Sequence, residues 1–261
     1  MRQLVKGKGV RSRSGRVPGE ILYKGKSRLD GKTPIVAILT CSPTGNRKIG
    51  DYVMQTWILV QGKSPIEAVT SGKDSAVCGG CQLRPFLRKK MKAKGIEPPT
   101  KQPCYVTTFM APGQVWRSWK NGSYSKEPIA LPKNFKLRLG AYGDPAAVPM
   151  AVWAALIMRL REANRVDKRL HVGYTRQWET FQDVAEICMA SVFSETERER
   201  AKALGFRTFR IRGKDDPLLQ NEFACPASAE EDNRLTCEGC MACNGSGGVD
   251  DGRADVSIIA H

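Results

Sequence analysis

The sequence predicts an α/β fold of parallel strands and crossover helices, as in a (β/α) barrel that is either regular or distorted and incomplete. Three observations predict it. Short runs of β-branched and aromatic residues recur along the chain, helical patterns separate several of them, and from residue 136 onward strands and helices alternate. Such alternation is typical of parallel strands joined by crossover helices. An open doubly wound sheet is the alternative, although no glycine-rich phosphate-binding motif follows a strand.

The expected strands are rich in β-branched or aromatic residues and are bounded by turn-forming residues. In order they are 34–40, 104–110, 136–142, 170–174, 187–193, 208–212, 222–228 and 255–261. The expected helices are 145–164, which has apolar residues at helical spacing, the short segment 179–186, and 195–206. The last of these begins with acidic residues and reaches Gly205 where a C-terminal cap is expected.

Length and composition predict one sizeable core, because the chain has 261 residues of which 41% are hydrophobic. Residues 1–33 carry ten Lys or Arg and only two acidic residues, so we expect a flexible basic arm there. Residues 34–261 are then a single barrel-like catalytic domain. Cysteine-rich insertions are expected in it at 78–104 and 225–243.

The charge of the chain indicates a polyanionic partner. The formal net charge is +16, and a second basic cluster follows at 84–95. Nucleic acid is the commonest partner of such a surface, so DNA is the expected one. The chain contains no run of about 18 apolar residues, so no membrane-spanning segment is predicted. The basic N-terminus has no apolar stretch of a signal peptide, so we expect a cytoplasmic protein in which cysteines serve metal binding or catalysis.

Four of the nine cysteines fall in one polar segment: Cys225, Cys237, Cys240 and Cys243. Three of these thiols lie within seven residues, in the pattern Cys-x2-Cys-x2-Cys. Four soft ligands from one loop suit a tetrahedral zinc ion or an iron–sulfur cluster. His261 could replace Cys225 as the fourth ligand.

A second metal site is predicted at Cys78, Cys81 and Cys104. The first two form a Cys-Gly-Gly-Cys knuckle, and the third follows 23 residues after Cys81. Only three thiols are visible, so Cys41 or an outside ligand must complete the set, unless this is an iron–sulfur site open to substrate. Cys188 lies in an apolar strand and is expected in the core.

If the fold is a barrel, its reaction site lies where the strands end and the connecting loops meet. Polar or aromatic candidates follow the predicted strands there: Asp144, Gln177, Trp178 and Ser194. Asp144 precedes Pro145 and an apolar helix, so it is also a good helix N-cap. His171 lies inside a strand and is expected to be structural.

Residues 34–261 resemble a family of phage proteins in the segments TGNRKIGDYVMQTWIL, VCGGCQLRP, CYV, APGQVW, GAYGDPAAVP, GYTRQW and CPAS…CEGCMAC. In these motifs the chain is similar to the short branch of phage-encoded 7-deazaguanine DNA transglycosylases, which are relatives of the tRNA-guanine transglycosylases. The tRNA enzymes carry Cys-x-Cys-x2-Cys and a distant His. This chain departs from them, with Cys-x2-Cys-x2-Cys followed by His261.

The resemblance implies a (β/α) barrel with zinc near its C-terminus, acting on DNA and a 7-deazaguanine base in the cytoplasm of a phage host. In the implied reaction a guanine is flipped out and expelled by a carboxylate, and a 7-deazaguanine base then displaces that carboxylate. By their positions in the predicted fold, the candidates for these roles are Asp144 and then Asp51 as the catalytic or base-reading carboxylate, Gln177 at the base edge, Tyr142 and Trp178 as stacking faces, and Ser194 as a substrate-binding residue.

Two other functions stay open. One is an iron–sulfur enzyme on a partial barrel, although the absence of a Cys-x3-Cys-x2-Cys motif counts against radical chemistry. The other is a zinc-containing phage protein that binds nucleic acid without catalysis. Metal analysis separates them, because iron–sulfur proteins are coloured and zinc proteins are not. The number of subunits is not indicated by the sequence.

Overall fold

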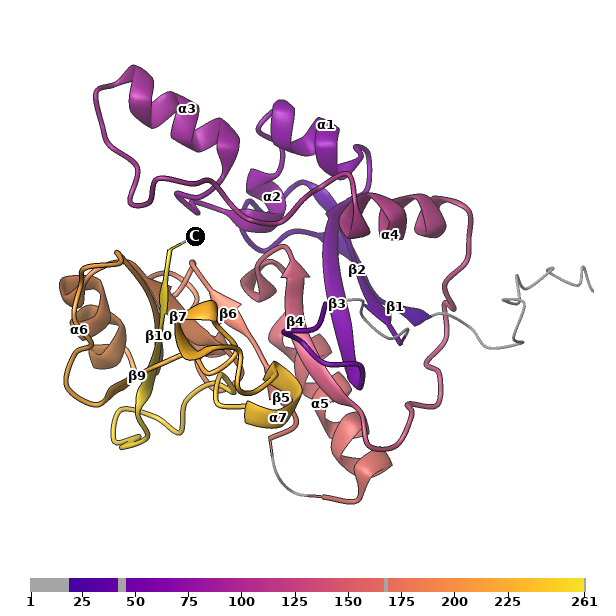
Figure 1. The fold of residues 1–261 in the computed structure, drawn as a ribbon. Coiled ribbons are helices and arrows are strands. Elements are labelled where there is room, and N and C mark those ends of the chain that lie inside the picture. The colour runs from indigo at the N-terminus through magenta and orange to yellow at the C-terminus, as the bar shows by residue number, and fades with distance from the viewer. Residues whose placement is uncertain (1–18, 42–45, 167–168, 261) are drawn as a thin grey trace, which may run out of the picture.

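The computed structural model describes residues 19–41, 46–166 and 169–260, and these form two five-stranded sheets (Figure 1). The first sheet has the order β1-β2-β3-β4-β5 and the second β6-β7-β8-β10-β9. The strands are β1 (Gly19–Lys26), β2 (Pro34–Thr40), β3 (Val53–Val60), β4 (Lys136–Tyr142), β5 (His171–Val172), β6 (Tyr174–Thr175), β7 (Met189–Val192), β8 (Thr208–Arg212), β9 (Glu222–Ala224) and β10 (Asp255–Ile259).

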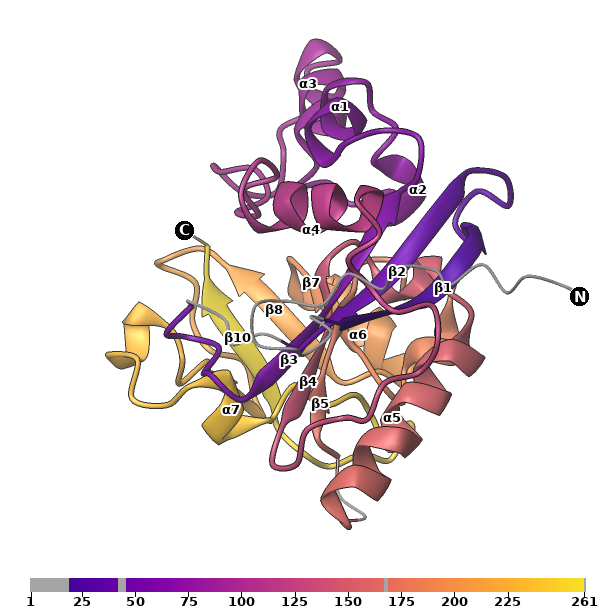
Figure 2. The same cartoon turned by 90° about the vertical axis from the view of Figure 1, so that its right-hand side faces the viewer.

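Helices lie between most of the strands. They are α1 (Pro65–Thr70), α2 (Ser75–Cys78), α3 (Pro85–Ala93), α4 (Ala111–Lys120), α5 (Met150–Asn164), α6 (Glu195–Ala203) and α7 (Cys237–Cys240), with 3-10 turns η1 (Pro145–Ala147), η2 (Gln182–Val184) and η3 (Ala229–Glu231). The first four helices form a lobe at one end of the first sheet (Figure 2). No helix of the described residues is long and apolar enough to cross a membrane.

Gly173 joins the two sheets. It is the single residue between β5 and β6, its N–H donates to the carbonyl of Cys243, and its own carbonyl accepts from the N–H of Met189. A Cβ at this position would lie 2.9 Å from the Cys188 sulfur and from the Ile187 carbonyl oxygen. Only glycine therefore lets the chain bend here between two neighbouring strands.

Most of the strand pairing is parallel. The pairs β3–β4, β4–β5, β6–β7, β7–β8, β8–β10 and β9–β10 are parallel, whereas β1–β2 and β2–β3 are antiparallel. Among the described residues β1 and β9 are edge strands, so the sheets do not close into a barrel. The prediction of a mixed α/β fold with parallel strands is confirmed, whereas the described residues form two separate sheets and no closed barrel.

The cysteine-rich loop contacts both sheets, because the N–H of Gly173 between β5 and β6 donates to Cys243 and other residues of the loop contact the starts of β3 and β4. The backbone N–H groups of Cys237 and Glu238 donate to the carbonyls of Lys48 and Ile49, just before β3 begins. The side chain of Lys136, at the start of β4, donates to the carbonyl of Glu238. This loop therefore contacts the first sheet at the end where β3 and β4 begin.

The main core lies between the first sheet and α5. Trp153, Leu156 and Leu160 of α5 are almost completely buried together with the apolar residues of β2, β3 and β4. The indole N–H of Trp153 donates to the carbonyl of Pro145, which fixes α5 at the end of β4. Burial of these large side chains supplies most of the driving force for this half of the fold.

Several predicted elements are confirmed, and others need correction. The strands 34–40, 136–142 and 208–212 have the predicted bounds, and those at 187–193, 222–228 and 255–261 are shorter. Segment 145–164 is divided into η1 and α5, and segment 179–186 forms only the turn η2.

The prediction of a strand at 104–110 is wrong. This segment contains no strand, and Tyr105 and Phe109 are 73% and 64% exposed. Cys104 donates its N–H to Leu83 in the helical lobe, so the segment follows the lobe and has no strand neighbour. The β-branched and aromatic residues of this segment, which favoured a strand, lie on an exposed segment outside both sheets.

The prediction of a flexible arm over 1–33 is wrong for its second part. Residues 19–26 form β1, which pairs with β2, and Glu20 is buried in an ion pair with Arg159 at 2.6 Å. The basic composition concealed the short apolar run Ile21-Leu22-Tyr23 of this strand. Residues 1–18 lie outside the described residues.

Candidate functional site

Three cysteines meet where β4 and β6 end, and they are called the mouth group here: Cys78, Cys81 and Cys104. Cys78 ends α2, and the N–H of Cys81 donates to its carbonyl. The N–H of Cys104 donates to the carbonyl of Leu83, which brings this distant cysteine beside the knuckle. The thiols are close enough that Cys81 and Cys104 both raise the pKa of Cys78.

Arg84 and Gln177 hold the knuckle of the mouth group. Arg84 is buried in an ion pair with Asp74 at 2.6 Å and donates to the carbonyl of Gly79 at 2.7 Å. The side-chain amide of Gln177 donates to the carbonyl of Cys78 at 3.1 Å and accepts from the N–H of Gly80 at 3.3 Å. The knuckle is thus positioned from both the lobe and the second sheet. This is the kind of supporting shell that metal ligands usually have.

Asp144 lies beside the mouth group as a fully hydrogen-bonded carboxylate. Its backbone N–H donates to the carbonyl of Val77 in α2. Its Oδ1 accepts from Ala146 N–H at 3.0 Å and Thr175 Oγ1 at 2.8 Å, and its Oδ2 accepts from Arg176 N–H at 2.7 Å. Burial raises the pKa of Asp144 in spite of these bonds. The predicted N-cap is confirmed, since the side chain caps η1.

Tyr142 places an unpaired hydroxyl in the same region. It is the last residue of β4 and is buried, and among the described residues its hydroxyl has no hydrogen-bond partner. Burial raises its pKa, and the neighbouring Cys78, Asp74 and Cys104 raise it further. A buried polar group without a partner is uncommon in folded proteins. This hydroxyl is therefore available to a group bound at the mouth.

The other predicted substrate residues lie apart from one another. Trp178 is 1% exposed and belongs to the core, so neither face of its indole is open to a base. Ser194 caps α6 by accepting from the N–H of Glu197 at 3.1 Å. Asp51 is exposed and precedes β3, at the opposite end of the parallel strands from Asp144. The two proposed carboxylates are thus not part of one site.

The late cysteines come together as a second group, called the loop group here: Cys225, Cys237, Cys240 and Cys243. All four line one small cavity of about 20 Å³, beside Val172, Tyr174 and Val256 of the second core. The hydroxyl of Tyr174 and the thiol of Cys243 are close enough that each affects the pKa of the other. The predicted ligand His261 lies outside the described residues.

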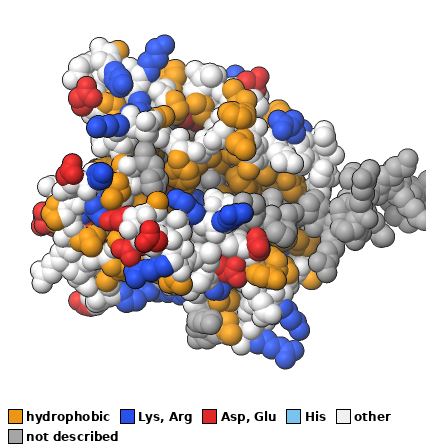
Figure 3. All heavy atoms as spheres, viewed as in Figure 1, with side chains coloured by type: hydrophobic (Ala, Val, Ile, Leu, Met, Phe, Trp, Pro, Cys, Tyr) orange, Lys and Arg blue, Asp and Glu red, His pale blue; other side chains and the backbone are white. Residues whose placement is uncertain are grey.

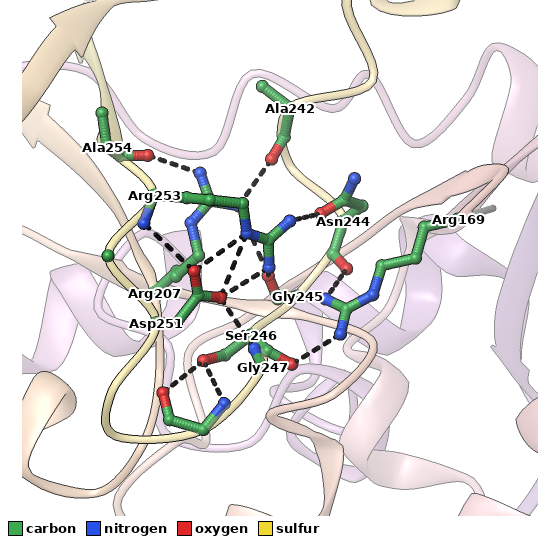
Figure 4. Close-up of polar contacts among 12 residues, drawn as sticks. Arg169, Arg207, Ala242, Asn244, Gly245, Ser246, Gly247, Asp251, Arg253 and Ala254 are labelled. Atoms are coloured by element: carbon green, nitrogen blue, oxygen red, sulfur yellow. Dashed lines mark hydrogen bonds and ion pairs between the residues drawn. The ribbon is translucent and has the colours of Figure 1, made fainter.

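Arginine side chains hold the loop that carries Cys243 (Figure 4). Arg207 donates to the carbonyls of Ala242 and Ala254, and Arg169 donates to the carbonyls of Asn244 and Ser246 at 3.1 and 3.0 Å. Arg253 pairs with Asp251 at 2.6 Å and donates to Gly245 at 3.1 Å. The loop is therefore held by charge-assisted hydrogen bonds that do not involve the thiols.

Arg138 connects the surroundings of the two groups. Its guanidinium donates to the hydroxyl of Tyr105, the residue after Cys104, at 2.7 Å. The thiol of Cys237 and the hydroxyl of Tyr174 are near enough to affect its pKa, which is raised although burial lowers it. A largely buried arginine thus lies between the mouth group and the loop group.

Burial raises the pKa values of the three mouth-group thiols and those of Cys225, Cys237 and Cys243 in the loop group. The pKa of Cys81 is raised to about 11, and those of Cys104, Cys225 and Cys237 are also raised. Neighbouring thiols add to the effect within each group. Such thiols are poor nucleophiles on their own, and a bound cation would stabilise their thiolate forms.

The donor chemistry of both groups fits a thiolate-bound metal. Within the described ranges, no group of three or more His, Cys, Asp or Glu side chains is arranged to hold a metal ion. The four-cysteine set nevertheless has the composition of a closed structural site, and the three-cysteine set has that of a site with an open position. The unpaired hydroxyl of Tyr142 beside the second set also fits a bound group there. Zinc and iron–sulfur therefore stay predictions.

Cys41 does not complete the mouth group. Its sulfur lies 3.6 Å from that of Met54, and the charges that affect its pKa are those of Glu20 and Arg159. Burial raises that pKa to about 12. The prediction that Cys188 belongs to the core is confirmed, since this residue is completely buried.

Sequence reasoning did not find Arg138, Tyr105 and Arg84. In β4, Arg138 lies between Leu137 and Leu139. Successive side chains of a strand point to opposite faces of the sheet, so this alternation predicts that Arg138 lies on the face opposite to the two leucines. Tyr105 was assigned to a strand. No protein-family model, curated protein or solved structure matches the chain.

Proposed function

We propose that this protein is a DNA-modifying enzyme whose reaction site is the mouth group of Cys78, Cys81 and Cys104. The observation that carries the proposal is the convergence of three half-buried thiols at the ends of parallel strands, next to the unpaired hydroxyl of Tyr142. Three protein ligands leave a position for a substrate or water, and that is how catalytic metal sites differ from structural ones. The charge of +16 supports a nucleic acid as the substrate.

In this proposal each residue of the mouth has a separate task. The cysteines hold a zinc ion or an iron–sulfur cluster, which supplies Lewis-acid or redox chemistry at its open position. Gln177 and Arg84 keep the knuckle in place, and Asp144 orients the loop that starts at Thr175. The exposed side chains of Tyr105 and Phe109 offer aromatic surface to a base above the mouth. Figure 3 shows hydrophobic side chains gathered between the upper and lower parts of this face.

The loop group has the structural task in this proposal. Its four thiols hold a second metal, and the loop around them contacts both sheets. A site with four protein ligands leaves no position for a substrate. Loss of this metal should therefore affect folding before it affects chemistry.

A second candidate is the exchange of guanine in DNA for a 7-deazaguanine base. The observation in its favour is that a carboxylate, Asp144, lies at the same mouth and affects the pKa of Cys81. A nucleophilic carboxylate needs a free oxygen lone pair directed at the sugar. Asp144 accepts three hydrogen bonds and is buried, so its geometry suits an orienting role better than attack.

The test begins with metal content. We expect anaerobically purified protein to contain zinc, or iron with sulfide, at two sites per chain. Cys81→Ser and Cys104→Ser should each remove one site and leave the melting temperature nearly unchanged. Cys41→Ser, which belongs to neither group, is the matched control. Full metal content in both mouth variants would overturn the proposal.

The reaction is then followed by mass analysis of nucleosides from DNA incubated with the protein, with and without 7-deazaguanine bases. A new nucleoside that requires both Cys81 and the added base supports base exchange at a metal-dependent mouth. A new nucleoside without the base supports another modification. Unaltered DNA from the metal-loaded protein contradicts DNA modification as the function.

A further inference from the structure

A lysine-lined groove lies at the C-terminal end of β3, outside the mouth group. Its volume is about 650 Å³, and the side chains that matter here are those of Lys24, Lys63, Lys73, Lys120, Gln61 and Trp119. The four lysines come from four separate segments: β1, the turn after β3, the turn before α2, and the end of α4. Convergence of like charges from distant segments costs free energy, so it suggests a site for an anion.

Among the residues that the structure describes, no acidic residue lines this groove. Two acids of neighbouring segments are hydrogen-bonded: Glu67 accepts from the N–H and hydroxyl of Ser64 at 2.8 and 2.7 Å, and Asp30 accepts from the backbone N–H groups of Lys32 and Thr33 at 3.0 and 2.9 Å. The charge of Lys63 also contributes to lowering the pKa of Glu67. The charge of the groove is therefore positive. A phosphate group is the common biological ligand for such a surface.

Trp119 adds an aromatic surface to the lysines. The ammonium of Lys120 lies 4.9 Å from the centroid of the Trp119 ring and 5.2 Å from that of Trp116. The indole of Trp116 donates to the carbonyl of Val60 at 3.2 Å, which fixes α4 beside the groove. Aromatic rings together with lysines are the usual equipment of grooves that bind single-stranded nucleic acid.

The groove is joined to the mouth group through one short segment. Lys73 lines the groove, and the next residue, Asp74, is the buried partner of Arg84. Arg84 in turn holds the knuckle by its bond to the Gly79 carbonyl. A chain of phosphates bound by Lys63 and Lys73 would therefore lie close to α2, which ends at Cys78.

We propose that this groove binds the sugar-phosphate backbone of single-stranded nucleic acid, with a base against Trp119, next to the reaction site. Its volume is in the range of small-ligand pockets, so it has room for one or two nucleotides and not for a duplex. The proposal that the bound strand leads to the mouth group rests on the proposed function. The binding of a single strand by the groove does not.

The experiment measures fluorescence anisotropy of a labelled single-stranded DNA oligonucleotide with the full chain, over a series of salt concentrations. The groove variant combines Lys63→Gln, Lys73→Gln and Lys120→Gln. We expect it to weaken binding by about tenfold or more and to reduce the slope of log Kd against log salt by about 2, because each phosphate contact contributes about 0.7. Trp119→Leu should also weaken binding, whereas Trp119→Phe should retain most of it.

The matched control combines Lys89→Gln, Lys92→Gln and Lys94→Gln, which removes the same charge from α3 and its C-terminal cap, away from the groove. Melting temperatures are compared for all variants. The proposal fails if both triple variants weaken binding equally, since the effect is then diffuse charge. It also fails if a duplex of the same sequence binds the wild type more tightly, or if free inorganic polyphosphate binds as well as the oligonucleotide and Trp119→Leu has no effect.

Failure of the groove and failure of the proposed function can be told apart. Metal content and nucleoside products test the mouth group, whereas anisotropy with the groove variant tests the groove. If the protein binds single-stranded DNA normally but contains no metal and forms no modified nucleoside, only the proposed function is contradicted. Product formation with unchanged binding by the groove variant would contradict only the groove.

Discussion

Arg138 donates a hydrogen bond of 2.7 Å to the hydroxyl of Tyr105, and this contact joins β4 to the segment between α3 and α4. Tyr105 belongs to the exposed segment that carries Cys104, and Arg138 belongs to β4 and lies near Cys237. One guanidinium thus contacts the segment of one cysteine group and the thiol environment of the other. A positive charge near Cys237 stabilises its thiolate relative to the thiol.

The first prediction concerns this arginine. Arg138→Met removes the charge near Cys237, so we expect a metal in the loop group to be released to a chelator several times faster. Tyr105→Phe removes one hydrogen bond and should cost about 1 kcal/mol of stability with little change in metal release. Release is followed with a coloured chelator, and stability by denaturant unfolding. Equal release from wild type and Arg138→Met would show that this charge does not act on the loop group.

The second prediction concerns the loop group. Cys240→Ser should lower the melting temperature and the metal content together, because binding of a structural metal is coupled to folding. The arginine contacts around Cys243 should keep part of the loop folded, so the variant should lose the contact of α7 with Lys48 first. Hydrogen exchange at residues 237–240 measures this. A metal-free variant with wild-type melting would contradict the structural role.

The third prediction concerns Asp144. In Asp144→Asn, the asparagine Oδ1 can still accept from Ala146 and Thr175. Its amide NH2 group would take the place of Oδ2, which in the wild type accepts from the N–H of Arg176, so two donors would face each other. We therefore expect Asp144→Asn to cost about 1–3 kcal/mol of stability, more than a simple cap replacement. Thermal unfolding checks the magnitude. Asp51→Asn is the control and should change stability little, because that residue is exposed.

The same variant separates the two candidate reactions. If Asp144 attacks the sugar, Asp144→Asn should reduce base exchange by more than about 100-fold at temperatures where the variant is folded. If it orients the mouth, activity should fall less and metal binding should weaken with it. Unchanged activity would exclude Asp144 from the reaction.

The fourth prediction concerns pH and His171. This side chain is buried, neither ring nitrogen has a hydrogen-bond partner among the described residues, and burial lowers its pKa to about 4. Between pH 6.5 and 4 the unfolded chain therefore binds a proton that the folded chain does not. Stability is lost as the pH falls through that interval, by up to about 3 kcal/mol from this group.

His171→Leu removes this titration. Urea unfolding at several pH values should show a smaller loss of stability between pH 7 and 4 for the variant than for the wild type, with the two closest in slope above pH 7. Parallel curves over the whole range would show that His171 does not titrate on unfolding. Carboxylates contribute equally to both proteins, so the difference isolates the histidine.

The sequence determined the local elements with strong periodicity and the presence of two cysteine groups. The strands 34–40 and 136–142 and the helix around Trp153 follow from β-branched runs and from apolar residues at helical spacing. β3 has the same β-branched content in Val53, Thr56, Ile58 and Val60, so it was recognisable by that signal too. The cap at Asp144 follows from the proline after it. Such features depend on neighbours along the chain.

The tertiary structure alone decided what depends on distant contacts. Whether β1 and β9 meet is a matter of long-range pairing, which local sequence does not encode. The same holds for the burial of Trp178, the separation of Asp51 from Asp144, and the placement of Cys104 beside Cys78 by a bond to Leu83. The hydrogen bond between Arg138 and Tyr105 joins residues 33 apart in the sequence, and no spacing along the chain specifies that contact.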